Sequence, residues 1–372
     1  MAHQETRVST VSSITVDHQA LRAVARAIVA ATGSDEAEAR EVSDHLVEAN
    51  LKGHDSHGVG MLPAYIKNFK DGQLHPNRRP KLLREDGSIA VFSGENGYGQ
   101  KIAREVTDWA IERARKSGVA IVALNNVQHI ARVGAYGEHV AAANLIGIFF
   151  VNSFSGPPFV APYGGSDGRY STNPICIAIP GRDPAAPFVL DFATSMVAMG
   201  KVRVAYNQGK PMAPGLLIDA QGKPTTDPSV LWPDRSLGAI LPFGLHKGYG
   251  LAVVAELLGG ALSGNETYAP ENDWNVGIRN GMLAIVFDPA RFGDLETFRK
   301  EADSFLKFTK ESPPADPSAP VMLAGEPERK MRARRVADGI PIDAKTWTDI
   351  RAAGQLVGIE PARIEELAHG AG

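Results

Sequence analysis

The sequence predicts an α/β protein in which helices cover a central sheet and both ends of the chain build a helical subdomain. Between Ile89 and Phe287, strand-like apolar runs alternate with helical patterns, an order typical of a sheet covered by helices. Towards both ends, apolar residues recur mainly at helical spacing. We therefore predict an N-terminal helical part over residues 1–85, a central α/β domain over 86–290, and a C-terminal helical part over 291–372 that packs with the N-terminal part.

Two helices are expected near the N-terminus. The first begins after Thr15, has Asp17 in its first turn and ends at Gly33. Ser34 is expected to cap the second helix, which reaches about Leu51 and has an acidic first turn that suits the helix dipole. The first helix carries an apolar stripe at helical period, made of Leu21, Val24, Ala25, Ile28 and Val29.

Predicted strands and helices alternate in the central region. The expected strands are Ile89–Phe92, Val119–Leu124, Ile146–Val151, Ile175–Ile179, Phe188–Asp191 and Met282–Phe287. The expected helices lie near Gln100–Lys116, Tyr136–Ala143 and Gly248–Leu262. After Pro289 the chain is expected to be mostly helical, with a proline-rich linker.

Composition excludes several classes of protein. With 372 residues, of which 44% are hydrophobic and 22% charged, the chain has the balance of a folded globular protein. A net charge of −3 gives no overall electrostatic case for a nucleic acid or an anionic membrane as partner. The single cysteine, Cys176, cannot form an internal disulfide and fits a reducing cytoplasm. The N-terminal segment lacks an apolar core, so we expect no signal peptide and a cytoplasmic protein.

The loop Gly53-His54-Asp55-Ser56-His57-Gly58 gathers polar side chains between glycines. Its histidines and aspartate could ligate zinc or iron. Alternatively, the loop places Ser56 and His57 at a cleft that holds a polar ligand, or it is a turn whose Ser and Asp bond their own backbone. No HExxH helix or cysteine pair supports the metal interpretation, so we expect no metal.

Further polar groups follow predicted strands, at the ends where open α/β sheets hold their ligands. The segment Asn125–Gly134 contains His129 and Arg132. Histidine is a natural general acid/base, and arginine can clamp a carboxylate or phosphate with two hydrogen bonds; the alternative is a surface histidine and a solvated arginine. Asp191 ends a later strand, where it can accept hydrogen bonds from ribose hydroxyls or cap the next helix.

Two glycine-containing segments open helices. His246 and Lys247 lie among three glycines at the start of an apolar helix, and such a loop binds anions at the helix N-terminus. We therefore favour a functional role there over a plain hinge. Gly325-Glu326-Pro327-Glu328 opens a later helix; its acids suit the helix dipole and would repel a phosphate, so ligand contacts there should be to hydroxyls or an amide. Neither a Rossmann G-x-G-x-x-G turn nor a P-loop occurs.

Together these segments resemble the malate/L-lactate dehydrogenase family of NAD(P)-dependent oxidoreductases, which is unrelated to the Rossmann-fold lactate and malate dehydrogenases. The resemblance runs from about Leu21 to Ile359. It rests on an ordered set of motifs: DSHG, QHIARVGAY, VAPYGG followed by STNP, LDFATS, PTTDP, HKGYGLA and GEPE.

The resemblance implies a three-layer α/β/α fold with a mixed, non-Rossmann sheet of the sulfolactate dehydrogenase type, and a homodimer. It also implies hydride transfer between NAD(P) and C2 of a 2-oxo or 2-hydroxy acid, with His129 as general acid/base. Ser56, His57, Tyr65, Arg132 and Lys247 are implied to lie near the substrate. The implied cofactor contacts are His57, Ala131, Arg132, Val133, Ser153, Val189, Leu190, Asp191, Phe192, Ala193, His246, Asn280, Gly325, Glu326, Pro327 and Glu328.

Two positions depart from the family pattern. Met61 stands where many members carry an arginine that helps to hold the substrate carboxylate, and Ala131 replaces a common glycine. Arg132 and Lys247 are then the cations expected to balance that carboxylate. The identity of the acid stays open, and reduction of cyclic imino acids or nucleotide binding without catalysis are the alternatives. Asp191 would repel a 2′-phosphate, so among the two cofactors NAD is favoured over NADP.

Overall fold

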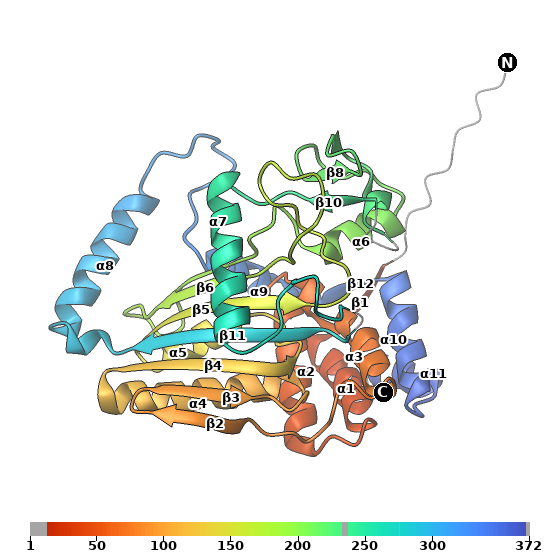
Figure 1. Cartoon of the computed structure of the whole chain (residues 1–372), viewed down its shortest axis with the longest axis horizontal. Helices are drawn as coiled ribbons and strands as arrows, with labels where there is room; N and C mark the ends of the chain where they lie inside the picture. The colour runs from red at the N-terminus through yellow and green to blue at the C-terminus, as the bar shows by residue number, and fades with distance from the viewer. Residues whose placement is uncertain (1–12, 233–236, 275, 370–372) are drawn as a thin grey trace.

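The computed structural model describes residues 13–232, 237–274 and 276–369. Its centre is a mixed seven-stranded sheet in the order β2-β3-β4-β11-β5-β6-β7 (Figure 1). Only β3 and β4 pair in parallel, and the other neighbours are antiparallel. The carboxyl ends of β3, β4, β5 and β7 therefore share one edge of the sheet. The strands are β2 (Lys81–Asp86), β3 (Ile89–Ser93), β4 (Val119–Gln128), β5 (Ile146–Phe154), β6 (Ile175–Ile179), β7 (Phe188–Phe192) and β11 (Arg279–Phe287).

The strands predicted for the central region are confirmed. They could be predicted because buried apolar residues mark them in the sequence. The edge strand β2 has no such signal: it pairs only with β3, and all its residues are exposed. Its charged residues protect an open sheet edge from pairing with another chain. For that reason the sequence does not predict it.

Helices cover both faces of the sheet. α4 (Gly99–Ser117) packs on β4 and β11, and α5 (Gly134–Ala142) packs on β5 and β6. On the opposite face, α7 (His246–Ala255) and the π-helical segment η4 (Glu256–Leu262) lie across β5 and β11 (Figure 1). A Cβ on Gly259 would lie 2.7 Å from the backbone nitrogen of Asn152, so only glycine lets η4 approach the sheet this closely.

The helix predicted over Gly248–Leu262 exists, but the prediction of its start and of a uniform α geometry is wrong. It begins two residues earlier, at His246, and changes from α to π geometry after Ala255. The change coincides with the buried glycines and with Glu256, whose carboxylate accepts hydrogen bonds from Asn173 and from the backbone of Tyr268. π-helical segments within α-helices often occur at functional sites.

Both ends of the chain contribute to one further core. Its helices are α1 (His18–Ala30), α2 (Glu36–Leu51), α3 (Leu62–Lys70), α10 (Ala344–Leu356) and α11 (Pro361–His369), whose apolar residues form one buried cluster. Strand β1 (Ser13–Val16) pairs antiparallel with β12 (Ile340–Asp343) and joins the two ends. The sequence does not predict this pairing. It also misplaces two caps: Asp17 and Asp35, not Ser34, accept the capping hydrogen bonds of α1 and α2.

A smaller lobe lies at the carboxyl edge of the sheet. It contains α6 (Met199–Asn207) and a three-stranded sheet of β8 (Leu217–Asp219), β9 (Pro224–Thr225) and β10 (Gly238–Ile240), around a separate buried cluster. The chain after Pro289 is mostly helical, as predicted, with α8 (Leu295–Lys310) and α9 (Glu326–Asp338) before α10. No helix in the described ranges is long and apolar enough to cross a membrane. The signal-peptide prediction falls largely on residues 1–12, outside the described residues.

Candidate active site

A cavity of about 820 Å³ lies where the carboxyl edge of the sheet meets the helical part built from both chain ends and the α6 lobe. Its size lies within the usual range of ligand pockets. It is lined mainly by the loop 52–60, residues 131–133 after β4, the segment 191–204 from β7 into α6, and parts of α9 and β12. The edge at which the sequence predicts ligand binding is thus the edge that carries the cavity.

The loop after α2 presents Ser56 and His57 to this cavity. The buried Asn50 holds the loop from below: its amide donates to Asp55 (2.6 Å) and accepts from the backbone of Val59 (2.9 Å). A Cβ on Gly58 would overlap that amide, so the glycine is required. The Asp55 carboxylate also pairs with Arg335 of α9 (2.7 Å). Asp55 is therefore occupied in holding the loop.

The metal interpretation of this loop finds no support. His54 faces Glu328 at 3.3 Å, Asp55 faces Arg335, and Nδ1 of His57 lies 3.0 Å from the Ser56 hydroxyl. The candidate ligands thus point to separate partners. Within the described residues, no group of three or more His, Cys, Asp or Glu side chains is arranged to hold a metal ion.

His129 immediately follows β4 and stacks on His57, with ring centroids 5.5 Å apart and an interplanar angle of 22°. Its Nδ1 is hydrogen-bonded to the Tyr65 hydroxyl at 2.8 Å, and Gln100 of α4 donates to the same hydroxyl at 2.8 Å. Nε2 has no partner among the described residues, so this nitrogen is available for proton exchange.

Burial sets the protonation of this histidine cluster. It lowers the pKa of His129 well below the ordinary value, and the neighbouring His57 and His45 lower it further. Burial likewise lowers the pKa of His57 to about 4 and that of His45 to about 3. All three imidazoles are therefore neutral at neutral pH.

The backbone after His129 is tightly fixed. The Asn280 amide accepts from the Ile130 N–H and donates to the Asn152 carbonyl, both at 2.9 Å. The Tyr136 hydroxyl donates to the Ile130 carbonyl at 2.6 Å. Ala131 adopts the left-handed region, with φ of 59°, which explains why glycine suits this position. Asn280, an expected cofactor contact, is thus engaged in positioning the His129 segment.

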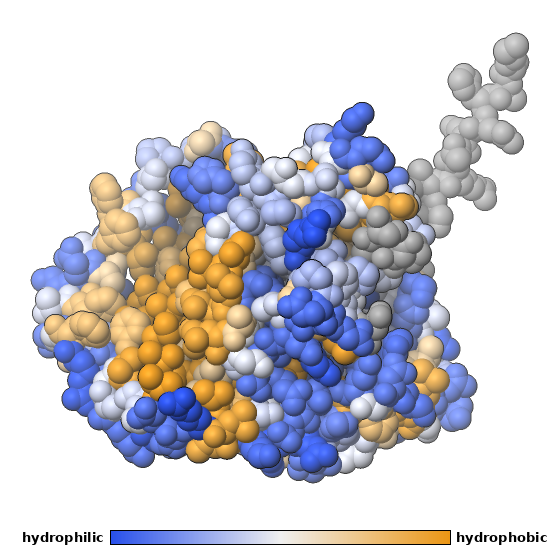
Figure 2. Space-filling view, viewed as in Figure 1, coloured by the Kyte–Doolittle hydropathy of each residue, from blue (hydrophilic) through white to orange (hydrophobic). Residues whose placement is uncertain are grey.

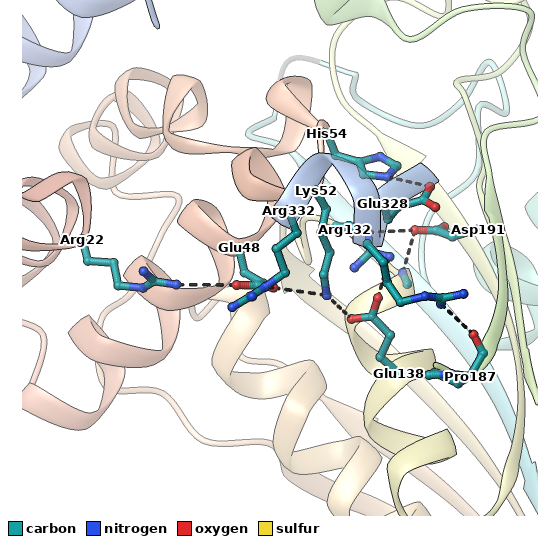
Figure 3. Close-up of polar contacts among 12 residues, drawn as sticks. Arg22, Glu48, Lys52, His54, Arg132, Glu138, Pro187, Asp191, Glu328 and Arg332 are labelled. Carbon is teal, nitrogen blue, oxygen red and sulfur yellow. Dashed lines mark hydrogen bonds and ion pairs between the residues drawn. The ribbon is translucent and has the colours of Figure 1, made fainter. Parts of the chain in front are cut away.

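Arg132 is buried within an ion-pair network (Figure 3). Its guanidinium lies 2.9 Å from Glu138 and 3.6 Å from Asp191, and Glu138 also pairs with Lys52 at 2.5 Å. Burial alone would lower the pKa of Arg132, but the two carboxylates raise it on balance. Arg132 lines the cavity, and two protein carboxylates balance its charge, although its Nε has no hydrogen-bond partner.

Asp191 shares this network. One carboxylate oxygen accepts the Gly134 N–H at 2.8 Å and lies near Arg132. Burial raises the pKa of Asp191, against the lowering effect of Arg132. A Cβ on Gly134 would lie 2.6 Å from both the Arg132 guanidinium and the Asp191 carboxylate. The glycine at the start of α5 therefore permits the ion pair.

The structure brings most, but not all, of the expected site residues to the cavity. Those that line it are Ser56, His57, Ala131, Arg132, Val133, Asp191, Phe192, Ala193, Pro327 and Glu328. His129 adjoins the cavity through its stacking on His57, and Tyr65 does so through its hydrogen bond to His129. The expected residues that do not line it are Ser153, Val189, Leu190, His246, Lys247, Asn280, Gly325 and Glu326. His246 and Lys247 are exposed at the start of α7.

Several residues of the site have no signal in the sequence. Gln100 lies within a helix, Glu138 on the next one, and Arg203 on α6. Each approaches the site only through tertiary packing. Gln100 follows Gly97 and Gly99, and Glu138 follows Gly137, but none of the three belongs to a motif singled out above. Spacing along the chain therefore gives no means of finding them.

Comparisons of the sequence and of the fold relate this chain to known proteins. The model of the malate/L-lactate dehydrogenase family matches residues 16–351. Hydroxycarboxylate dehydrogenase B of Escherichia coli K12 is 42% identical, over 92% of this chain and 94% of its own. The solved structure of sulfolactate dehydrogenase from Methanocaldococcus jannaschii superposes with a TM-score of 0.81 at 32% identity, covering 94% of this chain and 99% of its own.

A further solved structure, delta1-piperideine-2-carboxylate reductase from Pseudomonas syringae, has a TM-score of 0.79 at 28% identity and covers 92% of this chain and 99% of its own. The mixed seven-stranded sheet is thus shared with enzymes of known fold. The match extends over nearly the whole chain, including the loop of Ser56 and His57, the His129 segment and the start of α9. The chain belongs to the malate/L-lactate dehydrogenase family of oxidoreductases.

Proposed function

We propose that the protein is an NAD(P)-dependent 2-hydroxycarboxylate dehydrogenase in which His129 is the general acid/base. The observation that carries the proposal is the arrangement of His129: its Nδ1 is bonded to Tyr65, its ring stacks on His57, and its Nε2 has no partner in the described part of the chain. An imidazole held on one side and open on the other is suited to pass a proton to and from a bound substrate.

His129 acts through Nε2. In oxidation of a 2-hydroxy acid, the neutral ring takes the hydroxyl proton; in reduction of a 2-oxo acid, the protonated ring returns it to the developing alkoxide. In both cases the N–H at Nδ1 donates a hydrogen bond to the Tyr65 oxygen, which also accepts a hydrogen bond from Gln100. Tyr65 stays neutral, because burial raises the pKa of its hydroxyl. The bound nicotinamide supplies or accepts the hydride.

The cavity fits a nicotinamide nucleotide in size and in the chemistry of its walls. One buried carboxylate oxygen of Glu328, Oε2, has no hydrogen-bond partner, and a ribose hydroxyl would satisfy it. Asp191, Phe192, Ala193, Pro327 and Glu328 would hold the cofactor. Two carboxylates in this wall favour NAD over NADP, because they would repel a 2′-phosphate.

The test is a substrate panel followed at 340 nm with NADH and with NADPH. The panel contains the 2-oxo acids related to malate, lactate and sulfolactate, together with the cyclic imino acid 1-piperideine-2-carboxylate. We expect oxidation of NADH with at least one 2-oxo acid. Binding of NADH without oxidation on any of these compounds would overturn the proposal in favour of nucleotide binding without catalysis.

The likeness to a piperideine-2-carboxylate reductase supports reduction of a cyclic imine as the second candidate. It needs the same hydride transfer, with the proton passing to nitrogen instead of oxygen. Turnover of the imino acid with none of the 2-oxo acids would select this candidate.

We also propose that the protein is a homodimer and that it works in a reducing cytoplasm. For its fold we propose the three-layer architecture expected from the sequence, with parts that divide at residues 85 and 290. The apolar face of α7 and η4 supports the dimer, because Leu251, Val254 and Leu257 are exposed there and a broad hydrophobic region covers this side (Figure 2). The single buried thiol of Cys176 supports the reducing compartment. Light scattering measures the oligomeric state.

A further inference from the structure

The cations that line the cavity differ in how their charges are balanced. Lys52 pairs with Glu48 and Glu138, and Arg132 pairs with Glu138 and Asp191. Lys201 is exposed to solvent. Arg203 alone, among the described residues, is a partly buried cavity cation with neither a hydrogen bond nor an ion pair.

An arginine in this position is costly unless an anion approaches it. A partly desolvated guanidinium loses hydration, and its five N–H groups need acceptors. The protein supplies carboxylates to the other arginine of the cavity, as Figure 3 shows for Arg132, whose Nη2 donates to Glu138 although its Nε has no hydrogen-bond partner. It supplies none to Arg203. The unused hydrogen-bonding capacity faces a cavity that is built for a ligand.

The fold holds Arg203 close to the proposed reaction centre. α6 packs on the Asp55–His57 turn, where a Cβ on Gly200 would lie 2.7 Å from Cβ of Ser56. The Arg203 guanidinium lies beside Gly60, because a Cβ built there would be 3.6 Å from its Nη2. The same turn presents His57, whose ring stacks on His129. Val202, fully buried next to Arg203, anchors the helix.

We propose that Arg203 binds the carboxylate of the substrate, as the cation that positions a 2-oxo or 2-hydroxy acid against His129. This assignment rests on the proposed function. It replaces the expectation that Arg132 and Lys247 do so, since Arg132 is paired and Lys247 lies outside the cavity. A planar guanidinium binds a carboxylate with two parallel hydrogen bonds, which fixes the orientation of the adjacent C2.

The test compares Arg203→Met with wild type on the best acid of the substrate panel and on the uncharged amide of that acid. For the acid we expect kcat/KM to fall about 100-fold, the scale for removing one partner of a desolvated charge pair. For the amide we expect kcat/KM to change by less than about 3-fold, because this substrate offers no carboxylate for Arg203 to bind. Arg203→Lys should recover part of the loss, since it keeps the charge without the planar fork.

The control is Lys210→Met, which removes a positive charge just after α6, outside the cavity, and should leave both activities unchanged. Arg203→Gln is the second neutral variant if the methionine variant does not fold. Equal losses with acid and amide, or no loss, would overturn the assignment, as would an effect confined to the affinity for NADPH, which would assign Arg203 to a phosphate. A wild-type enzyme that reduces no 2-oxo acid would overturn the proposed function itself, whereas an active wild type with an unaffected variant overturns only this inference.

Discussion

The Tyr65 hydroxyl lies between Nδ1 of His129 and the amide of Gln100, at 2.8 Å from each. Tyr65 is almost completely buried, as is Gln100. Beyond the expectation that Tyr65 lies near the substrate, its hydroxyl contacts Nδ1 of His129, the proposed acid/base, and leaves Nε2 without a partner among the described residues.

Replacing His129 with asparagine should reduce turnover by about 10²–10⁴-fold, the usual contribution of general acid/base catalysis. Affinity for NADH should change little, because the variant keeps a polar side chain of similar size. Steady-state rates at 340 nm and NADH fluorescence titration measure the two quantities. Near-wild-type turnover would remove His129 from the acid/base role.

Tyr65→Phe should lower kcat about 10-fold or more while leaving KM within a small factor, because the imidazole loses the group that orients it. Tyr98→Phe is the matched control: its ring lies beside Tyr65, but its hydroxyl contacts Thr32 and not His129. Equal effects of the two variants would mean that Tyr65 acts only through packing.

The lowered pKa of His129 predicts opposite pH dependence in the two directions. Oxidation needs the neutral ring, so its kcat/KM should rise as pH increases through this pKa and reach a plateau below pH 6.5. Reduction needs the protonated ring, so its kcat/KM should fall over the same range. Initial rates from pH 5 to 8 test both; an oxidation profile that still rises above pH 7 would contradict the neutral resting state.

Acid should destabilise the fold because buried histidines are neutral. The pKa of His45 is about 3 in the folded chain and about 6.5 when unfolded. The unfolded state therefore binds this proton first, and stability falls as pH drops from 6.5 towards 3, by about 1.4 kcal/mol per unit. Urea unfolding at several pH values gives the slope. His45→Gln should flatten it, and an unchanged slope would exclude His45 as the source.

Gly134→Ala should destabilise the protein by about 2 kcal/mol or more, because its methyl group would separate Arg132 from Asp191 within a buried network. Gly293→Ala is the control, since a Cβ there meets nothing within 4 Å, and its effect should stay within about 0.5 kcal/mol. Thermal or urea unfolding compares the two. Similar stabilities would show that the ion pair tolerates displacement.

Much of the fold is predictable because burial leaves periodic patterns in the sequence. β4 and α1 are marked by their apolar residues. The caps are less predictable: the sequence places Asp17 in the first turn of α1 and Ser34 as the cap of α2, whereas Asp17 and Asp35 are the capping residues. The β1–β12 pair and strand β2 are not predictable, since their pairing depends on segments far apart in sequence or on an exposed edge.

The residues of the site likewise divide into those that the sequence reveals and those that it does not. His57 and His129 stand out in the sequence because polar residues cluster around them at strand and helix ends. Arg132 also stands out, but its pairing with Glu138 and Asp191 depends on side-chain packing that no spacing reveals. Arg203, in an ordinary helical pattern, is recognised only when the charges around one cavity are compared.

The shared core of the two chain ends has a consequence for synthesis. Helices α1 to α3 leave the ribosome before the central sheet, whereas α10, α11 and β12, the partner strand of β1, emerge after it. Until they emerge, the nascent chain displays an apolar surface that these later segments cover. Translation stalled between the central sheet and β12 would therefore yield a product prone to aggregate or to engage chaperones.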